Sequence, residues 1–191
     1  MVRPGREPLA GTIEIDETLL GGYEKREPGE GWRQLKVKTA IVVAAEAKEQ
    51  GRIGRIRLQE VPDTTEQSLV TFVKRNVAPG AAIVTDGWRG YNTLENHGFL
   101  RWRRPISTDE KQRKAHQLLP RVHRVASLLK RWLLGTHQGK ISKQQLGYYL
   151  DEFTFRFNRR LSADRGMLFY RLIQQAVAVD PTPYRKLKAQ S

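Results

Sequence analysis

Two apolar runs that each lead to an aspartate decide the fold of this chain: TIEIDE at residues 12–17 and AAIVTDGW at residues 81–88. Runs of this length and composition predict β-strands. An aspartate at the end of a strand projects its carboxylate from the edge of the sheet. If the two strands are neighbours, Asp16 and Asp86 bring together two oxygen ligands of the kind that Mg²⁺ prefers. Taken alone, either aspartate is also explained as a turn former or a helix cap.

The surrounding sequence predicts further strands and a crossover helix. The capping pattern DTTE at residues 63–66 starts a helix that Pro79 and Gly80 end. A short helix is predicted at residues 90–97. Strands are predicted at residues 11–20, 38–48, 52–61, 81–85 and 99–106, the first three as an antiparallel meander joined through a flexible connection at residues 21–31. This order predicts a mixed α/β sheet with Asp86 at the carboxyl end of its strand, where such sheets open their functional crevices.

The remainder of the chain predicts a loop at residues 107–116 and helices at residues 118–134, 142–161 and 165–179. On the first of these helices, apolar side chains recur at helical spacing and form a core-facing stripe. His123 and Lys130, two turns apart, line one flank of that stripe, and Arg124 and Arg131 form a second basic row. His123 is therefore either a residue that reaches a crevice at the sheet edge or a simple border residue of the core.

Positive charge is concentrated in one part of the sequence. The net charge is +14, and residues 101–160 contain 15 Lys and Arg against 4 Asp and Glu. A basic excess confined to one segment favours a surface for nucleic acid, with a solvated surface as the alternative. The absence of cysteine excludes disulfides and zinc ribbons within the sequence. No apolar run suits a signal peptide or a membrane span, so we expect a cytosolic, nucleoid-associated protein with no membrane partner.

Four motifs carry a resemblance to a known family. They are IDETLLGG at residues 15–22, VTDGWRGY at 84–91, SLLKRWLLGTHQG at 127–139 and YLDEFTFRFNRR at 149–160. Together they resemble the catalytic domain of bacterial insertion-sequence transposases of the Asp-Asp-Glu type, the group related to ISXO2-like transposases. The resemblance implies a ribonuclease H-like fold of the retroviral-integrase superfamily, with a mixed five-stranded sheet flanked by helices and further C-terminal helices.

The resemblance also implies a site and a reaction. It implies a catalytic set of Asp16, Asp86, a third residue on a helix, and a basic residue seven positions later, which corresponds to Lys130. The third position is His123, where the Asp-Asp-Glu form has a carboxylate. The implied metal ligands are Asp16, Asp86 and His123, and the implied cofactor is Mg²⁺ or Mn²⁺, with imidazole favouring Mn²⁺. Glu17 is a weaker candidate, because alternation along a strand points it away from the face of Asp16.

The implied partner is double-stranded DNA, at insertion-sequence ends and at a target, bound by a homodimer or higher oligomer. We expect the basic stretch to contribute its DNA-binding side chains: Arg124, Arg131, Lys140, Arg156, Arg159 and Arg160. The expected division is an N-terminal tail at residues 1–10, a catalytic domain at 11–179 and a basic C-terminal tail at 180–191. Without the zinc ribbon of its relatives, the chain is expected to be a truncated copy or the catalytic piece of a split protein. A non-catalytic DNA-binding remnant and a ribonuclease H-like nuclease remain the alternatives.

Overall fold

The computed structural model describes residues 6–21, 23–24, 33–34, 38–103, 118–138, 143–178, 180–181 and 183. Lys140, the predicted loop at 107–116 and most of the predicted C-terminal tail lie outside these residues. Within them, no helix is long and apolar enough to cross a membrane.

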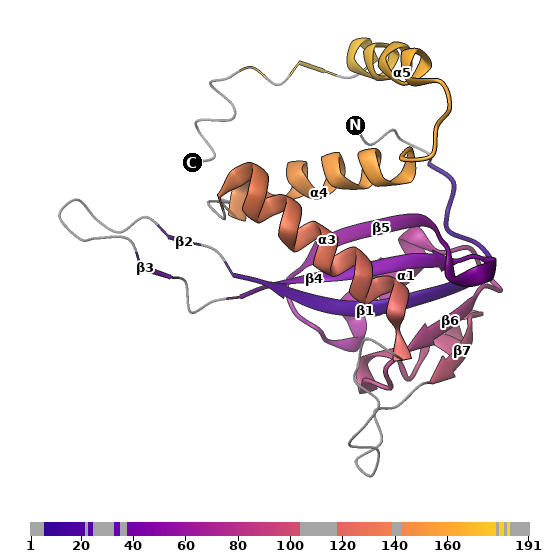
Figure 1. Ribbon diagram of the computed structural model, residues 1–191. Coiled ribbons are helices and arrows are strands. Elements are labelled where there is room, and N and C mark those ends of the chain that lie inside the picture. Colours follow the sequence, from indigo (N-terminus) through magenta and orange to yellow (C-terminus); the bar gives the residue numbers. More distant parts are fainter. Residues whose placement is uncertain are drawn as a thin grey trace.

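The mixed five-stranded sheet that the sequence predicted is confirmed (Figure 1). Its strand order is β5-β4-β1-β6-β7. The antiparallel meander forms one half, and β6 and β7 run parallel to β1 in the other. The strands are β1 (Thr12–Leu20), β4 (Thr39–Ala47), β5 (Ile53–Val61), β6 (Ala82–Thr85) and β7 (Leu100–Arg103). Two short strands pair with each other between β1 and β4: β2 (Tyr23–Glu24) within the predicted connection and β3 (Arg33–Gln34) just after it.

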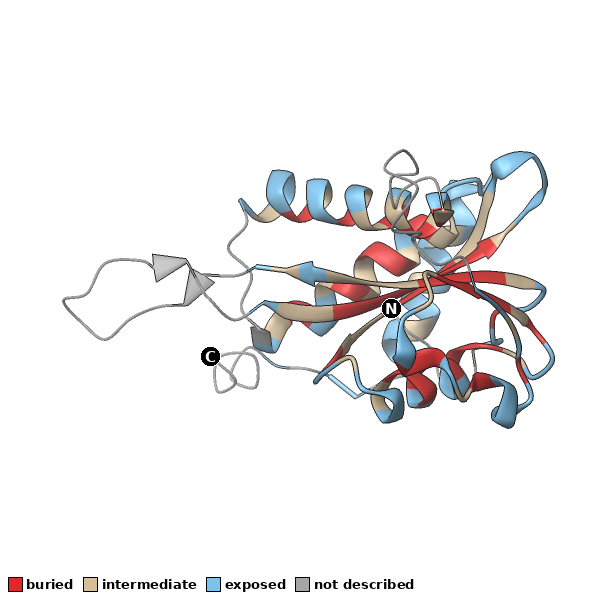
Figure 2. Ribbon diagram, turned by 90° about the horizontal axis from the view of Figure 1, so that it is seen from below, coloured by how far each residue is buried: buried red, intermediate tan, exposed pale blue. Residues whose placement is uncertain are grey.

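Helices cover both faces of the sheet. Helix α1 (Glu66–Asn76) packs on one face, and α3 (Pro120–His137) and α4 (Lys143–Asn158) pack on the other. Figure 2 shows the buried residues gathered along the strands and on the helix surfaces turned toward them. Helix α5 (Arg165–Val177) lies beyond α4 in Figure 1 and has no buried residue.

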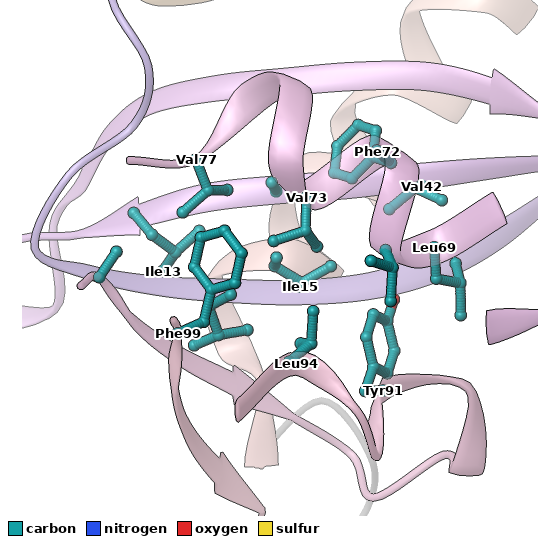
Figure 3. Close-up of a cluster of buried hydrophobic side chains, with 14 of the residues drawn as sticks. Ile13, Ile15, Val42, Leu69, Phe72, Val73, Val77, Tyr91, Leu94 and Phe99 are labelled. Carbon is teal, nitrogen blue, oxygen red and sulfur yellow. The ribbon is translucent and has the colours of Figure 1, made fainter. Parts of the chain in front are cut away.

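Alternation along β1 assigns its side chains to the two faces. Ile13 and Ile15 are fully buried in the cluster under α1 (Figure 3). Glu14, between them, faces α3 and accepts hydrogen bonds from its first turn. Asp16, two residues after Glu14, points to the same face of the sheet and contacts His123 of α3. The central strand therefore contributes apolar side chains to one face and carboxylates to the other.

The connection between β6 and β7 differs from the prediction. The predicted short helix at 90–97 is divided into two 3₁₀ turns, η2 (Arg89–Tyr91) and η3 (Leu94–His97). Tyr91 ends the first of these turns and Leu94 begins the second. Tyr91 and Leu94 are both fully buried against the α1 face, so this short connection supplies two core residues from one side (Figure 3).

The start of α1 and the N-terminal residues also differ from the prediction. Helix α1 begins after Thr65, whose side chain makes no cap bond, while the Asp63 carboxylate accepts from the backbone and hydroxyl of Thr65 and from Ser68. The predicted capping box is thus replaced by a local carboxylate turn.

At the N-terminus, Leu9 is fully buried, and its backbone forms hydrogen bonds with the backbone of Asn76 and Ala78. The packed structure therefore includes a residue assigned to the N-terminal tail.

Candidate functional site

Asp16 and Asp86 lie at the same level of two adjacent strands. Strands β1 and β6 are parallel, with Glu14 opposite Val84. Two residues further along, this register brings Asp16 level with Asp86, which directly follows the last residue of β6. Val84 packs in the cluster under α3, so alternation along the strand directs Asp86, two residues later, to the same face of the sheet. Asp86 follows the carboxyl end of β6, as predicted, whereas Asp16 lies in the middle of β1, because pairing with β4 continues this strand to Leu20. Both carboxylates lie beside the start of α3.

Burial and charged neighbours both affect the pKa of Asp16. Burial raises the pKa of Asp16 to about 6, the neighbouring His123 opposes this rise, and the charge of Asp86 adds to it. His123 Nε2 lies 3.5 Å from Asp16 Oδ2. The helix flank that carries His123 therefore does reach Asp16 on the central strand, which favours a site residue over a border residue of the core. A cation bound by Asp16 Oδ2 would share this oxygen with the His123 contact.

Glu17 is a third carboxylate of this cluster. As alternation predicted, it contacts a different element from Asp16: its carboxylate accepts a hydrogen bond from the buried hydroxyl of Tyr91. Burial nevertheless raises the pKa of Glu17 to about 7, and the charges of Asp16 and Asp86 contribute to the rise while the Tyr91 bond opposes it. We call Asp16, Glu17 and Asp86 the acidic cluster. Sequence reasoning underestimated Glu17, because its proximity to Asp86 depends on the turn after β6.

The turn after Asp86 is fixed by hydrogen bonds. Asp86 Oδ1 accepts from the Trp88 backbone N–H at 2.9 Å, so the turn-former reading of Asp86 is also correct. The Trp88 indole donates to the Thr64 carbonyl at 3.0 Å, and Arg101 donates to the Trp88 carbonyl at 3.1 Å. These bonds orient the Asp86 carboxylate, since one of its oxygens is held by the turn it begins.

Glu14 fixes the start of α3, and no local sequence pattern indicates this contact. Its side chain is 3% exposed and accepts from the backbone N–H groups of Arg121 at 2.7 Å and Val122 at 3.2 Å. It also accepts from Arg121 Nη1 at 2.7 Å. The same guanidinium donates to the carbonyls of Lys48 and Arg52 at the β4–β5 turn. A carboxylate on β1 therefore caps the helix whose next residue, His123, meets Asp16.

The other predicted site residues are distributed more widely. Lys130 is exposed two turns along α3 from His123, and no contact joins it to the acidic cluster within the residues described. Arg124 and Arg131 are exposed on the same helix. The three predicted DNA-binding arginines of the α4 end make contacts within the protein: Arg156 with Glu152, Arg159 over the Phe155 ring, and Arg160 over the Phe157 ring.

The fit to a divalent cation rests on the two aspartates. Among the described side chains, no group of three or more His, Asp, Glu or Cys is arranged as a ligand set for one ion. In this arrangement the His123 imidazole contacts Asp16 and does not complete such a set. The two carboxylates do fit a hard cation, because burial and the charge of Asp86 raise the pKa of Asp16, and the charge of a cation would offset both causes.

Comparisons with known proteins agree with this architecture. The fold is similar to the catalytic core domain of BIV integrase in a crystal structure, with a TM-score of 0.50 and 16% sequence identity over 81% of this chain and 88% of that one. No curated protein matches the sequence. The family model described as the ISXO2-like transposase domain matches residues 8–158, which include the whole sheet together with α1, α3 and α4. This chain therefore belongs to the family of ISXO2-like transposase domains.

Proposed function

We propose that this domain is a divalent-metal-dependent polynucleotidyl transferase that hydrolyses and joins phosphodiesters at insertion-sequence ends. One observation carries the proposal: in a transposase-family domain, Asp16 on β1 is level with Asp86 after the adjacent parallel strand, and the charge of Asp86 contributes to the raised pKa of Asp16. Paired carboxylates of this kind suit the binding of cations that act on phosphodiesters.

Each residue of the site has a role in this proposal. Asp16 and Asp86 hold Mg²⁺ or Mn²⁺, which when bound supplies Lewis-acid polarisation of the phosphodiester and of the attacking oxygen. His123 sets the charge and orientation of Asp16 through the contact at 3.5 Å. Lys130 binds a DNA phosphate further along α3. The exposed Arg124 and Arg131 extend the cationic surface along the same helix.

The reaction consists of two displacements at phosphorus. In the first, a water oxygen bonds to phosphorus, the P–O3′ bond breaks, and the departing strand retains a 3′-hydroxyl after taking up a proton. In the second, that 3′-hydroxyl loses its proton and bonds to phosphorus of the target strand, whose own P–O3′ bond breaks. Joining two ends in this way requires two sites, which favours a homodimer or higher oligomer on double-stranded DNA in the bacterial cytoplasm.

A nicking assay tests the proposal. Supercoiled plasmid is incubated with the chain in Mn²⁺, Mg²⁺ or EDTA, and nicked and linear products are separated on a gel. We expect weak nicking that prefers Mn²⁺, because His123 replaces a carboxylate ligand. Asp86→Asn should abolish it, while Glu95→Gln, an exposed carboxylate of η3, should not. DNA binding without any metal-dependent nicking would identify the chain as a non-catalytic remnant.

A further inference from the structure

A groove lies on the far side of α3 from the acidic cluster. Its volume is about 850 Å³, and it is formed by the β4–β5 turn, the first half of α3 and the end of α4. Apolar side chains from these elements line it, including Ile53, Leu128 and Phe157. Neither Arg52 nor Arg124, both exposed at its rim, has an ion-pair partner within the residues described.

The end of α4 supplies a flat cationic surface to this groove. The Arg160 guanidinium lies over the Phe157 ring, 4.0 Å from its centroid. It is held there by hydrogen bonds to the carbonyls of Ile53, Gly54 and Phe157. Because Arg160 is exposed and lines the groove, the guanidinium face turned away from Phe157 is open to it. Such a plane stacks well on a nucleobase.

We propose that this groove binds an unpaired nucleotide of the DNA substrate. The base stacks on the Arg160 guanidinium and contacts the apolar wall at Leu128, and the flanking phosphates pair with Arg52 and Arg124. This combination of a stacking surface with cations along the backbone is how proteins hold single-stranded nucleic acid. The inference rests on the proposed function for its DNA substrate.

The shape of the groove and its position favour this occupant. Four cationic side chains and one carboxylate, Glu49, contribute to the lining, so the groove favours an anion. A duplex is too wide to enter a groove of 850 Å³, whereas a single nucleotide fits. Arg124 follows His123 directly on α3, and Arg121 ties this turn to the carbonyls of Lys48 and Arg52. A strand that leaves the acidic cluster across the start of α3 therefore arrives at the rim of the groove.

The test compares two DNAs in EDTA, so that only binding is measured. One is a blunt fluorescein-labelled duplex, and the other is the same duplex with three unpaired thymidines at one 3′ end. In fluorescence anisotropy we expect the extension to increase the affinity of the wild type about tenfold. Arg52→Glu combined with Arg124→Glu should reduce this ratio to about one. Equal affinities for both DNAs in the wild type would overturn the proposal.

Lys74→Glu combined with Arg75→Glu is the matched control, since it reverses two exposed charges on α1 at the opposite face of the sheet. It should weaken the binding of both DNAs without changing the ratio of their affinities. With 5-iododeoxyuridine in the extension, ultraviolet crosslinks should map to residues 52–54, 124–128 or 157–161. Crosslinks elsewhere, or displacement of the extension by oligoglutamate as efficiently as by oligothymidine, would overturn the assignment to a nucleotide. A failure of the nicking assay would leave this binding result unaffected.

Discussion

Asp16 and Glu17 lie near Asp86, whose charge contributes to the raised pKa of both. Partial burial is the largest cause of the raised pKa of Asp16 and Glu17, and the neighbouring carboxylates add to it. Folding therefore favours protons on Asp16 and Glu17, and a cation in the same place would relieve the repulsion. The same groups that suit the site for a metal make the metal-free protein less stable at neutral pH.

The first prediction concerns stability against pH. Folding raises the pKa of Asp16 from 3.8 to about 6 and of Glu17 from 4.5 to about 7, so the folded state holds more protons than the unfolded state between these values. The free energy of unfolding should fall as the pH rises from about 4 to about 7, by up to about 3 kcal/mol per group. Urea denaturation in EDTA at a series of pH values measures this. Glu17→Gln keeps an acceptor for Tyr91 and should flatten the curve; an unchanged slope would contradict the prediction.

The second prediction concerns His123. An imidazole is a poor ligand for Mg²⁺ and adds no negative charge to the site. His123→Glu places a carboxylate at a helix position whose native side chain already reaches within 3.5 Å of Asp16. We expect Mg²⁺ affinity to rise about tenfold, equivalent to about 1.4 kcal/mol. Calorimetric titration of both forms checks this, and equal Mg²⁺ affinities would show that His123 does not lie at the metal position.

Helix α3 joins the acidic side of the sheet to the basic surface. Its apolar stripe was predictable from helical periodicity, because Val122, Val125, Leu129 and Leu133 are all buried. Its attachment was not predictable, since Glu14 and Arg121 are 107 residues apart and no local pattern relates them. The level positions of Asp16 and Asp86 followed from two similar strands, whereas the proximity of Glu17 depends on the tertiary placement of Tyr91.

The third prediction tests the attachment of α3. Glu14→Gln removes the charge that caps the helix, so the first turn that carries His123 should loosen. We expect a loss of about 2–4 kcal/mol in unfolding free energy and a reduced metal-dependent nicking rate. Glu46→Gln is a matched control, because Glu46 is also 3% exposed and is paired with Arg55 at 2.7 Å, but away from α3. Both variants should be destabilised in urea; an equal loss of nicking in both would contradict a specific role for Glu14.

At the scale of the whole molecule, the exposed basic residues of α3 and the paired arginines of α4 should contribute differently to DNA binding. Arg156 and Arg159 already contact Glu152 and Phe155. In our fourth prediction, neutralising Arg124 and Arg131 together lowers the slope of log K against log salt by about 2, one unit for each phosphate contact. Neutralising Arg156 and Arg159 should change this slope less. Anisotropy titrations at several salt concentrations measure both slopes, and the reverse order would assign the DNA surface to α4.

The central claim is that Asp16 and Asp86 hold a divalent cation between two parallel strands. Titration of Mn²⁺ into the wild type, followed by electron paramagnetic resonance of the free ion, tests it most directly. We predict a Mn²⁺ site that is lost in Asp16→Asn and in Asp86→Asn and kept in Glu95→Gln. Mn²⁺ binding that is unchanged in either aspartate variant, or absent from the wild type, would contradict the claim.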